Sequence, residues 1–154
     1  MENIFISETN FDRARKLIKD NKNKKIIFSS DDDELNRKIL EKENINVLLL
    51  NMEKRRDFQK QRNSGFNHVL AKIAKKKNVA IGINLDEIVK NSEKEKARII
   101  ARVRQNIQIC NKNKLKMEFI YKNNKRNLYD LKSLGLVLGM PTWMTNSLTE
   151  EKIQ

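Results

Sequence analysis

The sequence predicts an α/β protein built on a parallel sheet. Short apolar runs alternate along the chain with segments whose apolar residues recur at helical spacing, which is typical of β/α units. The clearest case is residues 66–83, where a helical pattern is followed by the continuous apolar run 79–83. Such a run is typical of a parallel strand buried on both faces. The length of 154 residues fits one domain with a core of its own.

The strands are expected where apolar residues run without interruption. Their ranges are residues 3–6, 25–28, 45–50, 79–83 and 116–121. Parallel neighbours need crossover connections, and the segments between these runs are long enough to hold helices.

The helices are expected where apolar residues recur every three or four positions. A helix at residues 11–18 is followed by one that Ser30 and Asp31 can cap, which runs through Leu35 to Leu40. The acidic residues 31–34 suit the positive end of that second helix dipole, so we do not assign them to a metal.

The third helix is expected to begin at Ser64, whose hydroxyl can cap a backbone N–H. Its core face comprises Phe66, Val69, Leu70, Ile73 and Ala74. Residues 84–86 are expected to begin a loop. A long helix follows at about 93–111 with Ile100, Val103, Ile107 and Cys110 as its seam, and a last one begins at Leu128 and ends near Gly135 or Gly139.

The pattern leaves two architectures open, an open doubly wound sheet and a partial (β/α) barrel. Both place right-handed crossovers between parallel strands. An eight-fold barrel takes about 250 residues, whereas this chain provides for five or six units. Periodicity alone does not choose between the two.

Composition excludes several classes of site. With one cysteine and one histidine, the chain cannot hold a disulfide framework or a multi-histidine metal site. It has no apolar run near the length that spans a bilayer, and its first residues do not read as a secretory signal. A reducing, cytoplasmic location is therefore expected.

Positive charge is concentrated in the middle of the chain. Residues 51–126 hold 21 Lys and Arg against 7 Asp and Glu, which accounts for the whole excess of +13. A basic region flanked by balanced ends indicates a polyanionic partner, of which nucleic acid is the commonest.

The candidate binding residues gather where loops leave the predicted strands. Loops after parallel strands emerge at one edge of a sheet, where α/β proteins bind ligands. Arginine suits this role because its guanidinium group can grip a phosphate in two places. Arg98 and Arg102, four residues apart, are expected on the exposed side of the long helix. The candidates are Arg55, Arg56, Lys60, Arg62, Asn63, His68, Lys72, Asn84, Arg98, Arg102, Lys122, Lys125 and Arg126.

Three aromatic residues, Phe58, Tyr121 and Tyr129, are candidates for stacking on bases. We expect at least two of them to be packing residues instead. No catalytic residues are assigned, because Cys110 falls on a buried seam and Asp86 with Glu87 alone make a weak metal site.

Four blocks of the sequence, in order, resemble the archaeal and eukaryotic ribonuclease P protein component 3 family. They are QRNSGFNHVLAKIA at 61–74, VAIGINL at 79–85, RIIARVRQNI at 98–107, and DLKSLG at 130–135 with LGM at 138–140. The resemblance covers residues 59–140. It divides a single domain, 1–154, into a divergent part at 1–50, a family-like part at 51–140 and a peripheral segment at 141–154.

The resemblance implies a TIM-barrel-like, PHP-like fold, here shortened and incompletely closed. It also implies a subunit of the RNA-based enzyme that removes 5′ leaders from precursor tRNA. In that family the RNA holds the catalytic Mg²⁺ and the protein holds no cofactor. The implied partners are the ribonuclease P RNA, precursor tRNA indirectly, and the ferredoxin-like component 2, and a second copy of the chain is a further candidate.

The shortened barrel carries its own expectation. A gap between the first and last strands would leave backbone groups to be covered. The apolar residues after Gly139, which are Met140, Trp143, Met144 and Leu148, are expected to cover that gap or to dock on a partner.

Two other functions remain open from the sequence. The chain could be a general RNA-binding α/β module without a fixed ribozyme partner, and co-purification with one defined RNA would separate this function from that of a ribonuclease P subunit. A metal-dependent phosphoesterase of the related PHP fold is disfavoured, because that fold builds its site from several histidines.

Overall fold

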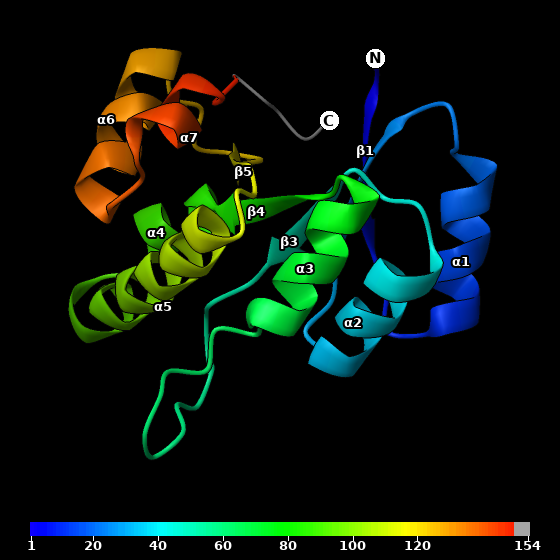
Figure 1. The fold of residues 1–154 in the computed structure, drawn as a ribbon, viewed down its shortest axis with the longest axis horizontal. Coiled ribbons are helices and arrows are strands. Elements are labelled where there is room, and N and C mark those ends of the chain that lie inside the picture. Colours follow the sequence, from blue (N-terminus) through cyan, green and yellow to red (C-terminus); the bar gives the residue numbers. More distant parts are fainter. Residues whose placement is uncertain (150–154) are drawn as a thin grey trace.

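A computed structural model describes residues 1–149, which form one five-stranded parallel sheet (Figure 1). Its strands are β1 (Asn3–Ser7), β2 (Lys25–Ser29), β3 (Val47–Leu50), β4 (Ala80–Asn84) and β5 (Met117–Ile120). The strand order is β1-β2-β3-β4-β5, so each strand lies beside its neighbour in sequence. A doubly wound sheet reverses its order at a switch point. The sheet is therefore wound as a barrel wall is, and the choice left open by periodicity is resolved.

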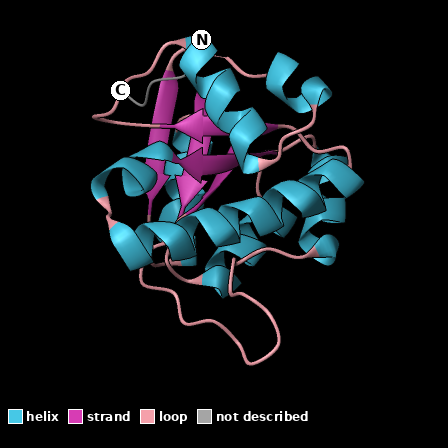
Figure 2. Cartoon of the chain, turned by 90° about the vertical axis from the view of Figure 1, so that its left-hand side faces the viewer, coloured by secondary structure: helices cyan, strands magenta, loops and turns pink. Residues whose placement is uncertain are grey.

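The helices follow the strands around the outside of the sheet (Figures 1 and 2). They are α1 (Phe11–Asp20), α2 (Asp33–Lys42), α3 (His68–Lys77), α4 (Leu85–Lys90), α5 (Glu93–Lys112), α6 (Leu128–Leu138) and α7 (Thr142–Asn146). Right-handed crossovers between sequential parallel strands place helices on one face of the sheet. None of the helices in residues 1–149 is long and apolar enough to cross a membrane.

The two faces of the sheet are packed differently. Ile26, Phe28 and Ile81 belong to a large core that they share with the helices. The other face carries a small cluster made of strand residues only, with Ile27 and Leu49 almost fully buried. Above this cluster, Lys25 Nζ of β2 lies 3.0 Å from Glu118 Oε2 of β5. Because these strands are not neighbours, the ion pair shows that the sheet curls strongly, although it does not close.

Asparagine and aspartate start most of the helices. The side chains of Asn10, Asp32, Asn67, Asn84 and Asn127 accept backbone N–H groups in the first turns of α1, α2, α3, α4 and α6. The predictions of caps at Ser30 or Asp31, and at Ser64, were therefore wrong by one to three residues. The acidic residues Asp33 and Glu34 do lie in the first turn of α2, as the dipole argument expects.

The start of α3 differs from its prediction in more than the cap. Gly65 has φ +67° and turns the chain before the helix begins at His68. Phe66 is buried ahead of the helix, whereas Val69 is 56% exposed. The predicted core face was displaced because the helix begins four residues later than Ser64.

Residues 84–86 form the start of a helix, not of a loop. The Asn84 side chain accepts the Glu87 backbone N–H at 3.3 Å and begins the short helix α4. In α5 the buried seam contains Ile99, Val103, Ile107 and Cys110, so Ile99 takes the place predicted for Ile100.

The segment after Gly139 packs within the chain. Gly139 has φ +103° and ends α6 in the left-handed conformation that glycine adopts without strain. Met140, Met144 and Leu148 are buried in the large core, and Trp143 Nε1 donates to Asn111 Oδ1 of α5 at 3.0 Å. These buried side chains are not free to dock on a partner, which corrects one of the two expectations. Residues 150–154 of the predicted peripheral segment lie outside the described residues.

Candidate nucleic-acid interface

A cavity of about 820 Å³ lies at the carboxyl ends of the strands. We call it the strand-end cavity. Side chains that end or follow all five strands line it, including Ser7, Asp31, Asn51, Asn84 and Lys122. Two loops and the end of β4 therefore bring five of the candidate binding residues to one cavity, namely Arg55, Arg56, Asn63, Asn84 and Lys122.

The longest loop at this edge is residues 51–67, between β3 and α3, which we call the basic loop. It projects from the body of the molecule in both views (Figures 1 and 2). A loop of this length keeps one conformation only if its backbone groups find partners. Partners for these backbone groups come from α4 and α5.

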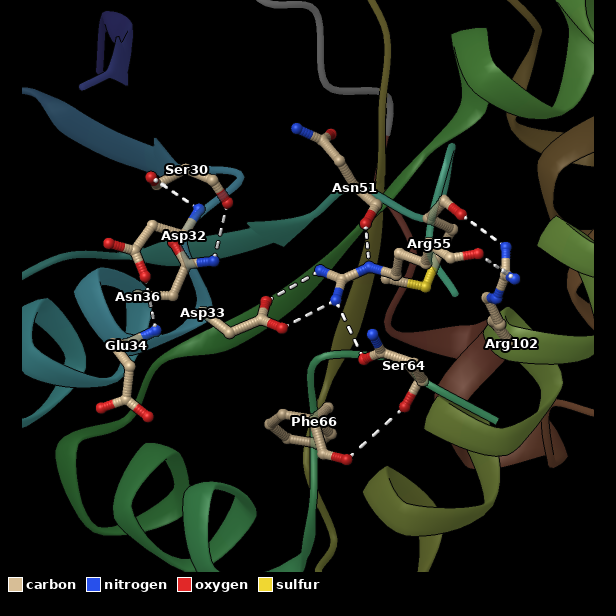
Figure 3. A network of polar contacts seen from close by, with 12 residues as sticks. Ser30, Asp32, Asp33, Glu34, Asn36, Asn51, Arg55, Ser64, Phe66 and Arg102 are labelled. Atoms are coloured by element: carbon tan, nitrogen blue, oxygen red, sulfur yellow. Dashed lines mark hydrogen bonds and ion pairs between the residues drawn. The ribbon is translucent and has the colours of Figure 1, made fainter. Parts of the chain in front are cut away.

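Arg102 of α5 is the main partner of the basic loop (Figure 3). Its guanidinium group donates to Met52 O at 2.9 Å, to Arg55 O at 2.8 Å and to Asp57 Oδ1 at 3.1 Å. Arg102 is 1% exposed, so its predicted place opposite the core seam of the helix was wrong. Its guanidinium group is buried and bonded within the protein, so Arg102 is no longer a candidate ligand for phosphate.

Arg55 is committed in the same way. Its two terminal nitrogens donate to the two carboxylate oxygens of Asp33 at 2.8 and 2.9 Å, while its Nε donates to Asn51 O at 2.6 Å. This bidentate pair joins the basic loop to the start of α2 (Figure 3). The Arg55 side chain is 9% exposed, so it too is corrected from a phosphate ligand to a structural residue.

Gly65 makes the Arg55–Asp33 pair possible. A Cβ atom at this position would lie 2.6 Å from Arg55 Nη2 and 2.8 Å from Asp33 Oδ1. Together with its positive φ, this close approach explains why glycine occupies the position.

Two residues of α5 that sequence reasoning missed hold the end of the basic loop. Gln105 Nε2 donates to Arg62 O at 3.2 Å and to Ser64 Oγ at 3.1 Å, and Asn106 Nδ2 donates to Ser64 O at 3.3 Å. Both lie in the block 98–107 and their partners lie in the block 61–74. The two blocks of family resemblance are thus contact partners, which is the signal that could have found them.

The side chains of three candidate residues are available to contact a partner molecule, namely Arg56, Lys60 and Arg62. All three are exposed. Within residues 1–149 no ion pair engages them, and α5 holds the backbone of the loop at Arg55 and at Arg62, on either side of Lys60. Exposed cations on a fixed loop are suited to contacts with a phosphate backbone.

The turn after β5 supplies the opposite wall of the strand-end cavity. Asp86 of α4 fixes this turn by accepting the N–H groups of Lys122 at 2.7 Å and Asn124 at 3.1 Å. Burial alone would raise the pKa of Asp86, but these donors outweigh it and lower that pKa below its usual value. The Lys122 ammonium group lies 4.2 Å from the centre of the Phe5 ring, a cation–π contact that orients it across the cavity.

The other candidates are more scattered. Lys125 is exposed beside Arg126, but Arg126 lines a different hollow with Leu85 and Asp130. Arg98 is exposed on α5, 3.8 Å from Glu95. Lys72 is exposed on α3, and His68 starts that helix with its Nδ1 3.1 Å from Asn113 Nδ2.

Polar side chains line the floor of the strand-end cavity. Asn84 Nδ2 donates to Asn51 Oδ1 at 3.0 Å, and Asn51 Nδ2 donates to Ser29 Oγ at 3.1 Å. Glu87 lies beneath them, 4% exposed, and accepts the Met52 N–H at 2.8 Å. Burial raises the pKa of Glu87 to about 7, and the nearby Glu53 carboxylate adds to the rise.

The aromatic candidates divide differently from the prediction. Tyr121 is 1% exposed and belongs to the core, whereas Phe58 is 60% and Tyr129 is 83% exposed. The expectation that at least two of the three are packing residues was wrong.

The described residues contain no group of three His, Cys, Asp or Glu side chains placed to hold a metal ion. Cys110 is buried on the α5 seam as predicted, and burial raises the pKa of its thiol to about 12. A thiol with this pKa is protonated at neutral pH and is a poor nucleophile.

No protein-family model matches the chain. Curated relatives do. The chain is 25% identical over 150 residues to ribonuclease P protein component 3 of Methanococcus vannielii, which covers 96% of this chain and 62% of that protein. The resemblance to component 3 is confirmed. The counterpart from Methanococcus maripaludis strain C7 is 23% identical over 152 residues, again with 62% of that protein covered.

A solved structure supports the fold. A chain of an archaeal ribonuclease P, determined with mature tRNA by cryo-electron microscopy, superimposes with a TM-score of 0.73 at 21% identity. The match covers 92% of this chain and 62% of that one. The expected TIM-barrel-like winding, shortened and unclosed, is confirmed. The chain spans about three-fifths of the length of the curated relatives it matches.

Proposed function

We propose that this chain is a protein subunit of ribonuclease P, and that it supports the catalytic RNA in removing 5′ leaders from precursor tRNA. The observation that carries the proposal is the similarity to component 3 over 96% of the chain. The interface agrees with it, because exposed cations stand on a loop that the protein itself fixes. The proposal assigns catalysis to the RNA and no reacting group to the protein.

The proposal includes the partners that such a subunit needs. The ribonuclease P RNA would contact Arg56, Lys60 and Arg62, and precursor tRNA would be reached through that RNA. Catalytic Mg²⁺ would be bound by the RNA. A component 2 protein is the proposed protein partner, with a second copy of the chain as the alternative, and the cytoplasm is the proposed location.

Reconstitution tests this function. The chain should restore 5′-leader removal when it is added to ribonuclease P RNA and the remaining subunits, and it should not cleave precursor tRNA alone with Mg²⁺. Multiple-turnover cleavage by an RNA-free preparation would contradict the proposal. Equal affinity for ribonuclease P RNA and for an unrelated structured RNA of the same length would favour a general RNA-binding module.

The exposed cations of the basic loop give a sharper prediction. Replacing Arg56, Lys60 and Arg62 with alanine should weaken binding to ribonuclease P RNA, because each phosphate contact releases counterions. The slope of log affinity against log salt should fall by about 2–3 units if all three residues touch phosphates. Filter binding at several salt concentrations measures this slope.

A matched control uses three lysines at the other edge of the sheet. Lys76, Lys112 and Lys116 are exposed, and they lie just before β4 and β5 instead of after a strand. Their replacement by alanine removes the same charge but should change the slope much less. An equal or larger change in this control would place the RNA on the opposite edge.

A further inference from the structure

Phe58 is an apolar ring exposed at the tip of a charged loop. The residue is 60% exposed although burial of an aromatic side chain is favourable. The turn that presents it is closed by a hydrogen bond from the Phe58 N–H to Gln61 O at 2.9 Å. The preceding residue, Asp57, is anchored by Arg102 at 3.1 Å and by the Asn63 N–H at 2.9 Å. The ring is therefore held outward by ordered neighbours.

Phe58 forms one side of a separate hollow of about 410 Å³, which we call the loop hollow. Arg62 and Asn67 line it from the basic loop, His68 from the start of α3, and Gln105 from α5. Its volume is near the lower end of the range for small-ligand sites, about 300–1,000 Å³. This volume suits one nucleotide and is too small for a duplex.

The polar groups of the loop hollow fit a nucleotide. Asn113 Nδ2 donates to Ile109 O at 2.8 Å, which identifies this atom as the amide nitrogen, and it lies 3.1 Å from His68 Nδ1. The hollow thus offers an imidazole ring and the exposed guanidinium group of Arg62 beside an aromatic face.

We propose that the loop hollow binds one unpaired nucleotide of the RNA partner, with its base stacked on Phe58 and its phosphate at Arg62. This inference rests on the proposed function and adds a site to it. Bases in a duplex are not free to stack on a side chain, so the nucleotide must come from a loop, bulge or single strand. An RNA is favoured over an apolar protein segment because most of the side chains that line the hollow are polar or charged, with Arg37 and Arg62 set against the carboxylates of Asp33 and Glu34.

The test uses an oligouridylate of about 12 nucleotides, within the range that single-strand sites cover, and a blunt RNA duplex of equal length. The Phe58→Ala variant should bind the single strand about 5- to 100-fold more weakly, the effect of a lost base–aromatic stack. Phe58→Leu should lose nearly as much, because leucine is apolar but has no ring, while Phe58→Trp should bind as tightly as the wild type. Duplex affinity and the salt slope should not change.

Tyr129→Ala is the matched control. Tyr129 is the other strongly exposed aromatic residue, 83% exposed on α6, and its loss should leave single-strand affinity unchanged. Wild-type affinity in Phe58→Leu, or an equal loss in Tyr129→Ala, would overturn the site. A loss of component 2 binding in Phe58→Ala with RNA affinity retained would also overturn it, in favour of a protein contact. If the residue-58 variants bind ribonuclease P RNA as tightly as the wild type does, only this inference fails. If the wild type itself binds no RNA, the proposed function fails.

Discussion

Replacing Arg102 with methionine is expected to lower the free energy of unfolding by about 3–5 kcal/mol. Methionine fills similar space but donates no hydrogen bond. The carbonyl groups of Met52 and Arg55 and the carboxylate of Asp57 would lose their shared donor. Loss of one partner from a buried polar network costs more than the contact itself contributes, because the remaining groups stay desolvated. Urea unfolding with linear extrapolation measures the change.

Arg98→Met provides the control for this variant. Arg98 lies one turn earlier on α5, its side chain is 60% exposed, and its ion pair with Glu95 is long at 3.8 Å. The same chemical change there should cost less than about 1 kcal/mol, as is usual for an exposed pair. Limited proteolysis should then cut the basic loop in Arg102→Met but not in Arg98→Met. If Arg102→Met is as stable and as resistant as the wild type, the loop is held by contacts other than the guanidinium group.

The contrast between Arg98 and Arg102 shows where sequence reasoning stops. Both residues lie on one helix, four positions apart, and periodicity assigned both to the exposed side. The basic loop reaches back over α5 and buries one of them, and its path depends on Asp57 and on backbone carbonyls that no pattern reveals. Burial of a charge is decided by such distant partners.

Cap residues illustrate a second limit. Ser64 and Asn67 are both favourable N-caps, and the turn at Gly65 decided between them. For α4 the signal was present but not used. Asn84 and Glu87 have the spacing of a capping box, and the Asn84 side chain does accept the Glu87 N–H. A six-residue helix has too few apolar positions to show a period, so its cap was the better indicator.

Other features followed directly from the sequence. Continuous apolar runs located all five strands because both faces of the sheet are buried. The meeting of basic and amide side chains at one edge followed from parallel winding, and the strand-end cavity brings Arg56, Asn84 and Lys122 together. The sequence could not predict which arginines are structural and which are exposed. Arg55 and Arg102 shape the loop, whereas Arg56 and Arg62 are left for a partner.

Glu87 is expected to make the protein less stable as the pH rises from about 4.5 to 7. Burial raises the pKa of this carboxyl group from 4.5 to about 7 in the folded state. In this window the folded chain keeps a proton that the unfolded chain has released, so the free energy of unfolding falls with increasing pH. The full effect across the window is about 3 kcal/mol, from about 1.4 kcal/mol for each pH unit.

Glu87→Gln should remove this slope. Glutamine retains an oxygen that can accept the Met52 N–H, now 2.8 Å from the carboxylate, but it carries no charge to desolvate. Above pH 7 the variant should therefore be more stable than the wild type by up to about 3 kcal/mol, and below pH 4.5 the two should converge. Urea unfolding at a series of pH values measures both curves.

Asp86→Asn is the neighbouring control, with the opposite sign. The pKa of Asp86 is lowered by the N–H groups of Lys122 to Asn124, which more than offset its burial. Its contribution to stability is present above the unfolded value of 3.8 and is lost as the pH falls through the folded value. Asp86→Asn should thus destabilise the protein at neutral pH while leaving the slope between 4.5 and 7 intact. A wild-type curve that is flat in this window, with Glu87→Gln destabilised at every pH, would show that Glu87 is ionised within the fold and stabilised there by Lys90.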